Sequence, residues 1–178
     1  MPISLRDARH YPEGQRWIEG VFPEYGDSLM AVSLNTGIFP VRGEFGDREP
    51  DMLARWFGDD SSYPLLVLKN DKPVGFAVVS KPAPLQRGQI DFRMAEFFVV
   101  SSQRRLGVGR EAVQLIFRRF AGRWEVTETQ NNKHAIAFWR SVVRAYSAGQ
   151  YRERLENGEV KQYFDSRQMR DAETSKRS

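Results

Sequence analysis

A carboxylate, several arginines and two glycines fall close together in one stretch of this chain. Glu96 precedes an apolar run that leads to Arg104 and Arg105, and glycines follow at positions 107 and 109. Glycines let the backbone approach a ligand closely, and the first N–H groups of a following helix attract anions. A partly buried glutamate can act as a base near neutral pH. These residues predict a phosphate anchor beside a proton acceptor, which suits a group-transfer enzyme.

Positioning these groups requires a strand, a loop and a helix in that order. We expect a strand over residues 89–100 and an amphipathic helix over residues 107–123. Strict alternation in the strand puts Glu96 on the apolar face that also carries Phe98. A carboxylate there needs a partner, or a bulge that turns it outward. An ion pair with Arg93, or a place on a solvent-exposed rim, is the alternative.

The other elements follow from periodicity and turn signals along the rest of the chain. We expect strands at residues 3–8, 65–68, 74–80, 124–129, 151–155 and 160–165, helices at 13–25 and 48–57, and a helix capped by Asn131 or Asn132. Residues 26–48 are expected to be a loop, with a short helical piece at 28–32. The order β α α β β β α β α β β predicts a mixed α/β fold. Residues 1–167 are expected to form one domain, and residues 168–178 a flexible C-terminal tail.

Composition limits the classes of function. The 178 residues carry a formal net charge of +4 and include no cysteine and only two histidines, which excludes thiolate chemistry and disulfides. The histidines have no metal-ligand spacing, so no metal is expected. The basic excess is concentrated near residues 104–123 and lacks interleaved aromatics, which argues against a nucleic-acid partner. No apolar run approaches a membrane span and the N-terminus resembles no signal peptide, so we expect no membrane partner and a cytoplasmic location.

Two familiar phosphate motifs compete for the glycine loop. The nucleotide P-loop needs Gly-Lys-Ser/Thr, whereas this chain has Arg110 and Glu111 after Gly109. The dinucleotide pattern GxGxxG/A is matched by Gly107, Gly109 and Ala112. Its first glycine should follow the strand almost directly, however, and residues 101–106 intervene. A dinucleotide-dependent oxidoreductase is therefore a minor alternative.

Two segments together resemble the GCN5-related N-acetyltransferase (GNAT) superfamily. Residues 97–109 are similar to the family's motif A, a strand followed by (Arg/Gln)-x-x-Gly-x-(Gly/Ala) and a helix. The series Asn132-x-x-Ala135-x-x-Phe138-Trp139 resembles a second motif at the right separation. The resemblance covers residues 3–165. It implies a mixed, mostly antiparallel central sheet with helices on both faces and a splayed cleft between two neighbouring strands.

The resemblance also implies a binding site for acetyl-CoA as cosubstrate. Loop amides would bind the pyrophosphate, and the pantetheine arm would contact the strand backbone at Phe98 and Val99 and the side chain of Asn132. Trp139 lies where the helix faces CoA. The implied pyrophosphate residues are Arg104, Arg105, Leu106, Gly107, Val108, Gly109 and Arg110.

The implied reaction moves an acetyl group to a primary amine by direct attack in a ternary complex. Glu96 would be the base, directly or through water. The family's tyrosine acid is replaced by Trp139, which cannot donate a proton to a thiolate. Tyr146, two turns further on the same helix face, is the candidate acid. A core or rim role for Tyr146, an acid at Tyr151, or departure of the thiolate without an acid are alternatives.

The acceptor is expected to be a small-molecule or peptide amine. The resemblance places it near residues 20–45, where Glu19, Glu24 and Asp27 can attract a cation or simply form a solvated helix face. Trp17, Phe22 and Tyr25 fit a core better than an aromatic cage. We expect a monomer or homodimer. A non-catalytic acyl-CoA-binding module on the same fold is a second alternative, because Trp139 replaces the usual tyrosine.

Overall fold

A computed structural model describes residues 2–36 and 52–168, with side chains described for 2–29 and 52–168. Its element order is the predicted one. The helices are α1 (Gly14–Thr36), residues 52–58, α3 (Val108–Arg119) and α4 (Lys133–Tyr146), with short 3-10 helices at Ala8–His10, Pro84–Gln86 and Ser101–Gln103. The strands are β1 (Ile3–Asp7), β2 (Ser62–Lys69), β3 (Lys72–Ser80), β4 (Phe92–Val99), β5 (Arg123–Thr129), β6 (Arg152–Glu156) and β7 (Glu159–Asp165).

The strands form one mostly antiparallel sheet in the order β1-β2-β3-β4-β5-β7-β6. The pairs β1/β2, β5/β7 and β6/β7 are antiparallel, and β4/β5 is parallel. The predicted mixed α/β fold is confirmed.

The chain divides into two compact units. Unit one comprises the described parts of residues 1–79 together with residues 96–109, and unit two comprises residues 80–95 and the described part of 110–178. The boundary crosses β4, so that strand contributes Phe92–Ala95 to unit two and Glu96–Val99 to unit one. A single domain over residues 1–167 stays a prediction, and most of the predicted tail lies outside the described residues.

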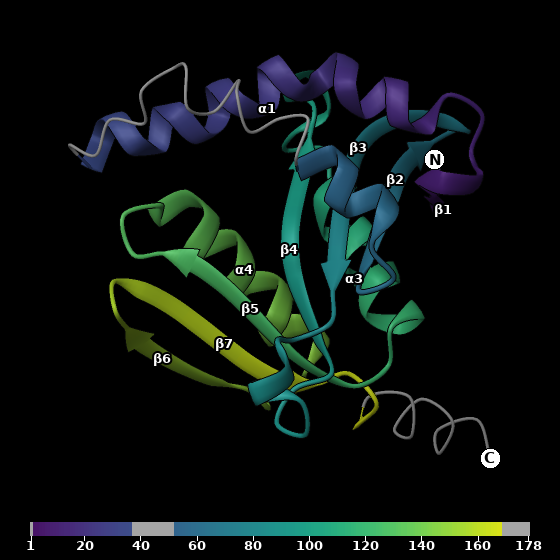
Figure 1. Ribbon diagram of the computed structural model, residues 1–178. Coiled ribbons are helices and arrows are strands. Elements are labelled where there is room, and N and C mark those ends of the chain that lie inside the picture. Colours follow the sequence, from purple (N-terminus) through teal and green to yellow (C-terminus); the bar gives the residue numbers. More distant parts are fainter. Residues whose placement is uncertain (1, 37–51, 169–178) are drawn as a thin grey trace. The chain divides into compact units, whose positions relative to one another are not determined.

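Unit one has an aromatic core between α1 and the strands. Figure 1 shows α1 running across β2 and β3. Tyr25 packs edge-on against Phe76 and Phe98, with ring centroids 5.3 and 5.6 Å apart. Ile18, Phe22 and Trp56 are buried in the same cluster. The prediction that Trp17, Phe22 and Tyr25 fit a core is confirmed for Phe22 and Tyr25, while Trp17 is only half-buried against this cluster.

Helix α1 is longer than its sequence predicts. Residues 26–36 continue the helix instead of forming a loop, even though Pro23 lies inside it. Gly26 and Asp27 are weak helix formers, which is why the sequence favoured an end of the helix at Tyr25. Tertiary contacts compensate: Tyr25 is buried in the core, and Ser28 Oγ accepts from Arg104 Nη2 at 3.2 Å. The rest of the predicted loop, residues 37–48, lies outside the described residues.

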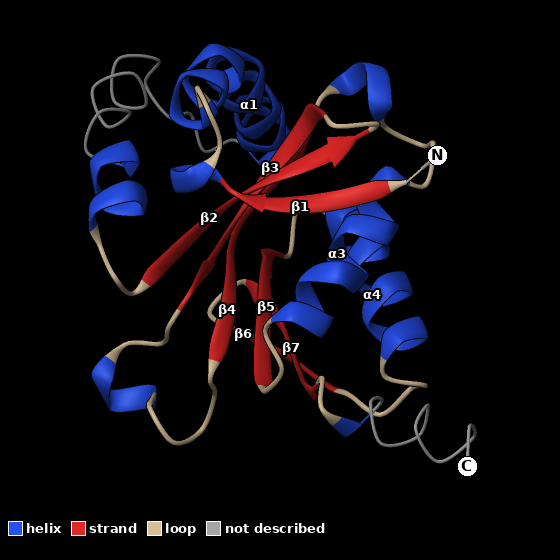
Figure 2. Ribbon diagram, turned by 90° about the vertical axis from the view of Figure 1, so that its right-hand side faces the viewer, coloured by secondary structure: helices blue, strands red, loops and turns tan. Residues whose placement is uncertain are grey.

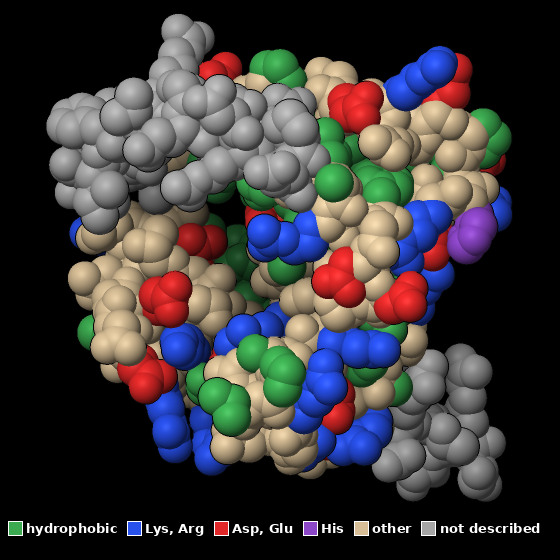
Figure 3. All heavy atoms as spheres, in the orientation of Figure 1, with side chains coloured by type: hydrophobic (Ala, Val, Ile, Leu, Met, Phe, Trp, Pro, Cys, Tyr) green, Lys and Arg blue, Asp and Glu red, His purple; other side chains and the backbone are tan. Residues whose placement is uncertain are grey.

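Unit two has a core of stacked aromatic rings. Phe117 of α3 packs edge-on against Trp124 at 4.9 Å, Phe164 at 4.7 Å and Tyr146 of α4 at 5.2 Å between centroids. Trp124 and Phe117 are fully buried. Figure 1 shows β5, β7 and β6 side by side, as their pairings require, and Figure 2 shows α3 and α4 on the same side of β5. The edge strand β6 is exposed along its whole length and alternates in charge, and Figure 3 shows basic and acidic side chains together over the lower left, where β6 and β7 lie.

The parallel ladder between β4 and β5 is short. Its register pairs Phe92 with Trp124 and Arg93 with Glu125, and the described residues show no further pair. The remaining residues of β5, up to Thr129, continue their antiparallel pairing with β7. The splayed cleft between two neighbouring strands stays a prediction.

Candidate active site

Glu96 is held by a tyrosine from α1. The Tyr25 hydroxyl donates a hydrogen bond to Glu96 Oε2, and the Tyr25 ring also contacts Phe98, so Glu96 and Phe98 share a face of the strand. Glu96 is half-buried. Tyr25 thus belongs both to the core and to the candidate site, a dual role that spacing alone does not reveal. That Glu96 acts as the base, and that a bulge turns it toward a substrate, stay predictions.

Arg93, the other partner considered for Glu96, pairs with Glu125 in unit two. Its Nη2 lies 2.5 Å and its Nε 2.8 Å from Glu125 Oε1. Glu125 is only 4% exposed, although no sequence motif marked it. It borders a cavity of about 360 Å³ that Arg93, Thr127 and Lys161 also line. Burial and the neighbouring Glu125 carboxylate raise the pKa of the Tyr163 phenol to about 12.

The glycine loop has a backbone suited to an anion. Arg105 and Gly107 have positive φ values of 61° and 82°, and α3 begins at Val108 directly after them. The first N–H groups of a helix have no intrahelical acceptor and point toward its N-terminus. Nothing lies within 4 Å of the position that a Cβ on Gly107 would take. The loop therefore fits a pyrophosphate, with the Arg105 and Arg110 side chains exposed nearby in sequence.

Arg104 is engaged inside this loop. Its backbone N–H donates to the Ser101 carbonyl at 3.2 Å, and its Nε donates to the Val99 carbonyl at 2.7 Å. Its guanidinium also lies over the Phe98 ring, 5.3 Å from the centroid. Of the predicted loop residues, Leu106 is 62% exposed and Val108 is buried. These contacts shape the turn that follows β4. The backbone N–H of Arg104 already has an acceptor in the Ser101 carbonyl.

Asn132, one of the two residues predicted to cap this helix, is the N-cap of α4. Its Oδ1 accepts the Ala135 N–H at 3.2 Å, and its side chain also hydrogen-bonds Glu128. A carboxylate only accepts hydrogen bonds, so the amide nitrogen must face Glu128. One more amide hydrogen remains for a ligand, which makes capping and the predicted pantetheine contact compatible. Asn132 and Glu128 both lie in unit two.

Glu128 is expected to make stability depend on pH. Burial raises its pKa above the ordinary value, against opposing hydrogen bonds from the Thr129 N–H, at 2.9 Å, and Asn132. Because the pKa of Glu128 is higher in the folded state, its contribution to the free energy of unfolding is complete below the ordinary glutamate pKa. That contribution is lost as pH rises through the folded-state pKa. Glu128→Gln should therefore gain stability relative to the wild type as pH rises from about 4 to 7. Urea unfolding at several pH values measures this difference, and a difference independent of pH would contradict the assignment.

Trp139 and Tyr146 lie on the buried face of α4. Both are buried, and Trp139 packs edge-on against Phe138. The Tyr146 hydroxyl donates to the Ser166 carbonyl at 3.4 Å within the aromatic core of unit two. This is the core role that the sequence left as an alternative. The helical period explains it, because residues 139, 142, 143 and 146 form one apolar stripe.

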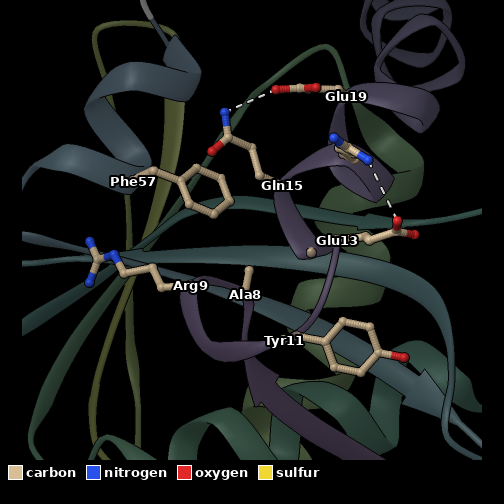
Figure 4. Close-up of a pocket in the computed structure, with 9 residues that line it drawn as sticks. Ala8, Arg9, Tyr11, Glu13, Gln15, Glu19 and Phe57 are labelled. Atoms are coloured by element: carbon tan, nitrogen blue, oxygen red, sulfur yellow. Dashed lines mark hydrogen bonds and ion pairs between the residues drawn. The ribbon is translucent and has the colours of Figure 1, made fainter.

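A separate hollow of about 390 Å³ lies in unit one beside the start of α1 (Figure 4). Several of its polar side chains are paired: Gln15 donates to Glu19 at 2.9 Å, and Arg16 lies 3.6 Å from Glu13. Arg9 Nη2 donates to the carbonyls of Trp56, Asp59 and Ser62 at 3.0, 2.9 and 2.6 Å. These bonds tie residues 52–58 to the N-terminus and indicate a structural role.

Two searches for other sites concern the described residues only. Within residues 2–36 and 52–168, no three His, Cys, Asp or Glu side chains gather as a metal site would require. No helix in the same part of the chain is long and apolar enough to span a membrane.

Comparison with known families agrees with this fold and loop. The model of the acetyltransferase (GNAT) family matches residues 30–142, more than half of the chain. The chain therefore belongs to the GNAT acetyltransferase family. The comparison with curated proteins found no match.

Solved acetyltransferases share the fold over almost the whole chain. An acetyltransferase from Thermus thermophilus is 18% identical with a TM-score of 0.60, over 92% of this chain and 96% of its own. An aminoglycoside 6'-acetyltransferase type Ii is 14% identical with a TM-score of 0.58, over 93% and 97%. The PaiA N-acetyltransferase from Thermoplasma acidophilum, solved with coenzyme A, is 9% identical with a TM-score of 0.54, over 93% and 99%.

Proposed function

We propose that this protein is an acetyl-CoA-dependent N-acetyltransferase that acetylates a primary amine by direct attack in a ternary complex. The observation that carries the proposal is the loop before α3. Two residues with positive φ lead into an open helix N-terminus, in a segment that resembles motif A of the family and lies within the residues matched by the family model. This arrangement suits a pyrophosphate better than a purely structural turn, because its N–H groups are left without intrahelical acceptors.

The donor would be held at several points. In unit one, the N–H groups of residues 105–109 would bind the pyrophosphate, and the backbone of Phe98 and Val99 would align the pantetheine arm. In unit two, Arg110 would contribute charge and Asn132 its remaining amide hydrogen, with Trp139 behind them on α4. The Val99 carbonyl already accepts from Arg104, which leaves its second lone pair and its N–H as the groups for a ligand.

Glu96 would remove the proton that makes the amine a nucleophile. Acetyl-CoA supplies an acetyl thioester, and the reaction forms a C–N bond while the C–S bond breaks. An alkyl ammonium has no lone pair, so it must lose a proton before attack. Glu96 would accept this proton directly or through water, with Tyr25 fixing its carboxylate. An N–H near Val99 would stabilise the negative oxygen of the intermediate.

No tyrosine is assigned as the acid in this proposal. Trp139 occupies the position where relatives carry the tyrosine, and the Tyr146 hydroxyl is engaged with the Ser166 carbonyl inside unit two. Thiols are acidic enough for CoA to leave as a thiolate near neutral pH. We further propose a small-molecule or peptide amine as acceptor, and a monomer or homodimer acting in the cytoplasm.

Thermal shift with acetyl-CoA and with NAD(P), followed by CoA release across a panel of amines, tests this function. Stabilisation by acetyl-CoA but not NAD(P), with release on amine addition, is the expected result. Stabilisation without release on a broad panel would favour the non-catalytic acyl-CoA-binding module. No stabilisation by any CoA species would eliminate both hypotheses, and stabilisation by NAD(P) alone would favour the oxidoreductase.

Reversing the charge of Arg110 should weaken CoA binding. Arg110 is exposed in the first turn of α3 and reaches Ser141 Oγ at 2.9 Å. Arg110→Glu places a negative charge beside the proposed phosphate site and should raise the Kd for CoA on the order of tenfold or more. Arg118→Glu is the matched control, because it makes the same charge change in the last turn of α3. Isothermal titration calorimetry compares the two, and equal effects would contradict a phosphate site at this helix end.

A further inference from the structure

Side chains of α1 hold the entrance of the phosphate-binding loop. Glu24 Oε1 accepts the backbone N–H of Ser101 at 2.6 Å. Ser28 Oγ accepts from Arg104 Nη2 at 3.2 Å and donates to the Glu24 carbonyl at 3.0 Å. The two anchors lie one helical turn apart, so they share a face of α1. This face therefore binds both ends of the segment 101–104.

The contact from Glu24 replaces a cap that the loop lacks. Ser101 begins the short 3-10 helix Ser101–Gln103, whose N-cap residue Val100 provides no side-chain hydrogen bond. A carboxylate accepting a backbone N–H makes a charge-assisted bond, stronger than a neutral one. A third anchor comes from β2, where Lys69 Nζ donates to Gln103 Oε1 at 2.8 Å.

The same turn of α1 also reaches the candidate base. Tyr25, next to Glu24, donates to Glu96. Figure 1 shows α1 passing over the end of β4 from which the loop leaves. One turn of α1 thus contacts both the carboxylate proposed as the base and the loop proposed to bind the donor.

We propose that Glu24 and Ser28 are positioning residues for the donor site. They hold residues 101–104 so that residues 105–109 keep the conformation that binds the pyrophosphate, without touching the donor themselves. This proposal rests on the proposed function. Preorganised loops bind more tightly because the ligand does not have to order them. Any displacement of this turn of α1 would change donor affinity and base geometry together.

Charge and positioning make opposite predictions for Glu24. A carboxylate close to an anion site repels the anion, so if charge dominated, its removal would tighten CoA binding. If positioning dominates, loss of the acceptor oxygen loosens the loop and weakens binding. Glu24→Gln removes the charge and keeps an acceptor oxygen, whereas Glu24→Ala removes both.

Calorimetric Kd values for CoA test the proposal. Glu24→Ala should raise the Kd about fivefold, and Ser28→Ala about two- to fivefold, as expected for losing a hydrogen bond worth roughly 1 kcal/mol. Glu24→Gln should keep the Kd for CoA within about twofold of the wild-type value, because it keeps an acceptor oxygen for the Ser101 N–H. Glu19→Ala is the control, because Glu19 is exposed and bonds only Gln15 among the contacts given above.

Hydrogen exchange of the residue 105–109 amides in the ligand-free protein gives a second readout. Faster exchange in Glu24→Ala and Ser28→Ala than in Glu19→Ala is expected. An unchanged Kd in both variants, or tighter binding by Glu24→Ala, would overturn the proposal, even if thermal stability falls. If Glu24→Ala does not fold, Ser28→Ala decides. If the wild type binds no CoA, the proposed function fails, and hydrogen exchange alone shows whether these residues hold the loop.

Discussion

Glu96→Gln is expected to lower kcat by about 10²- to 10⁴-fold near neutral pH while leaving the Kd for CoA unchanged. Glutamine keeps the size of the side chain and an acceptor oxygen for the Tyr25 hydroxyl, but it cannot take a proton. The loss should therefore appear in the chemical step and not in donor binding. Pre-steady-state acetyl transfer to an amine identified by the panel, together with calorimetry on CoA, measures both quantities.

Tyr25→Phe is the companion variant that separates a base from a structural carboxylate. Phenylalanine retains the edge-on contacts with Phe76 and Phe98 and removes only the hydroxyl. Loss of a donor to the ionised carboxylate makes ionisation harder. The acidic limb of the pH–kcat/KM profile should then move to higher pH. If Glu96→Gln turns over like the wild type at every pH, Glu96 has no part in proton removal.

Arg93→Met is expected to cost about 3–5 kcal/mol of unfolding free energy, because it strands a buried carboxylate. Glu125 is 4% exposed, and Arg93 provides two of its hydrogen bonds, at 2.5 and 2.8 Å. The double variant Arg93→Met/Glu125→Met should recover most of the loss, because well-packed apolar residues can replace a buried ion pair. Urea denaturation with linear extrapolation measures each variant.

Arg140→Met provides the matched control for this pair. Arg140 contacts Glu153 at a comparable 2.5 Å, but the two side chains are 52% and 26% exposed. Water and salt screen such a pair, so its loss should cost no more than about 1 kcal/mol. Similar losses for Arg93→Met and Arg140→Met would show that water reaches Glu125 and that its pairing matters little.

The loop before α3 could be predicted from sequence because its determinants are local. Glycine at position 107 allows a positive φ, and α3 starts at the next residue. The turn between β6 and β7 has local determinants too, because Asn157 and Gly158 have positive φ values of 52° and 77° that these two residue types favour. The Asn132 cap was predicted for the same reason, since it involves residues three positions apart. Neighbouring residues therefore carry the signals that predict these features.

The partners of the charged groups could not be predicted, because distant segments supply them. Glu96 bonds Tyr25, 71 residues away, and Arg93 bonds Glu125, 32 residues away. Strand alternation showed that Glu96 needed a partner but not which one. The extension of α1 beyond Tyr25 was not predicted, for the same reason. Its weak helix formers are compensated by packing and by contacts with the loop.

The sequence by itself determined the family's loop, the order of the elements and the candidate base, because short-range backbone preferences and periodicity encode them. Only the tertiary structure decided that one turn of α1 anchors that loop and contacts Glu96, and that the Tyr146 hydroxyl is engaged in the core. Packing across long sequence separations sets these contacts, and hydrophobic burial specifies which faces meet without specifying which polar atoms pair.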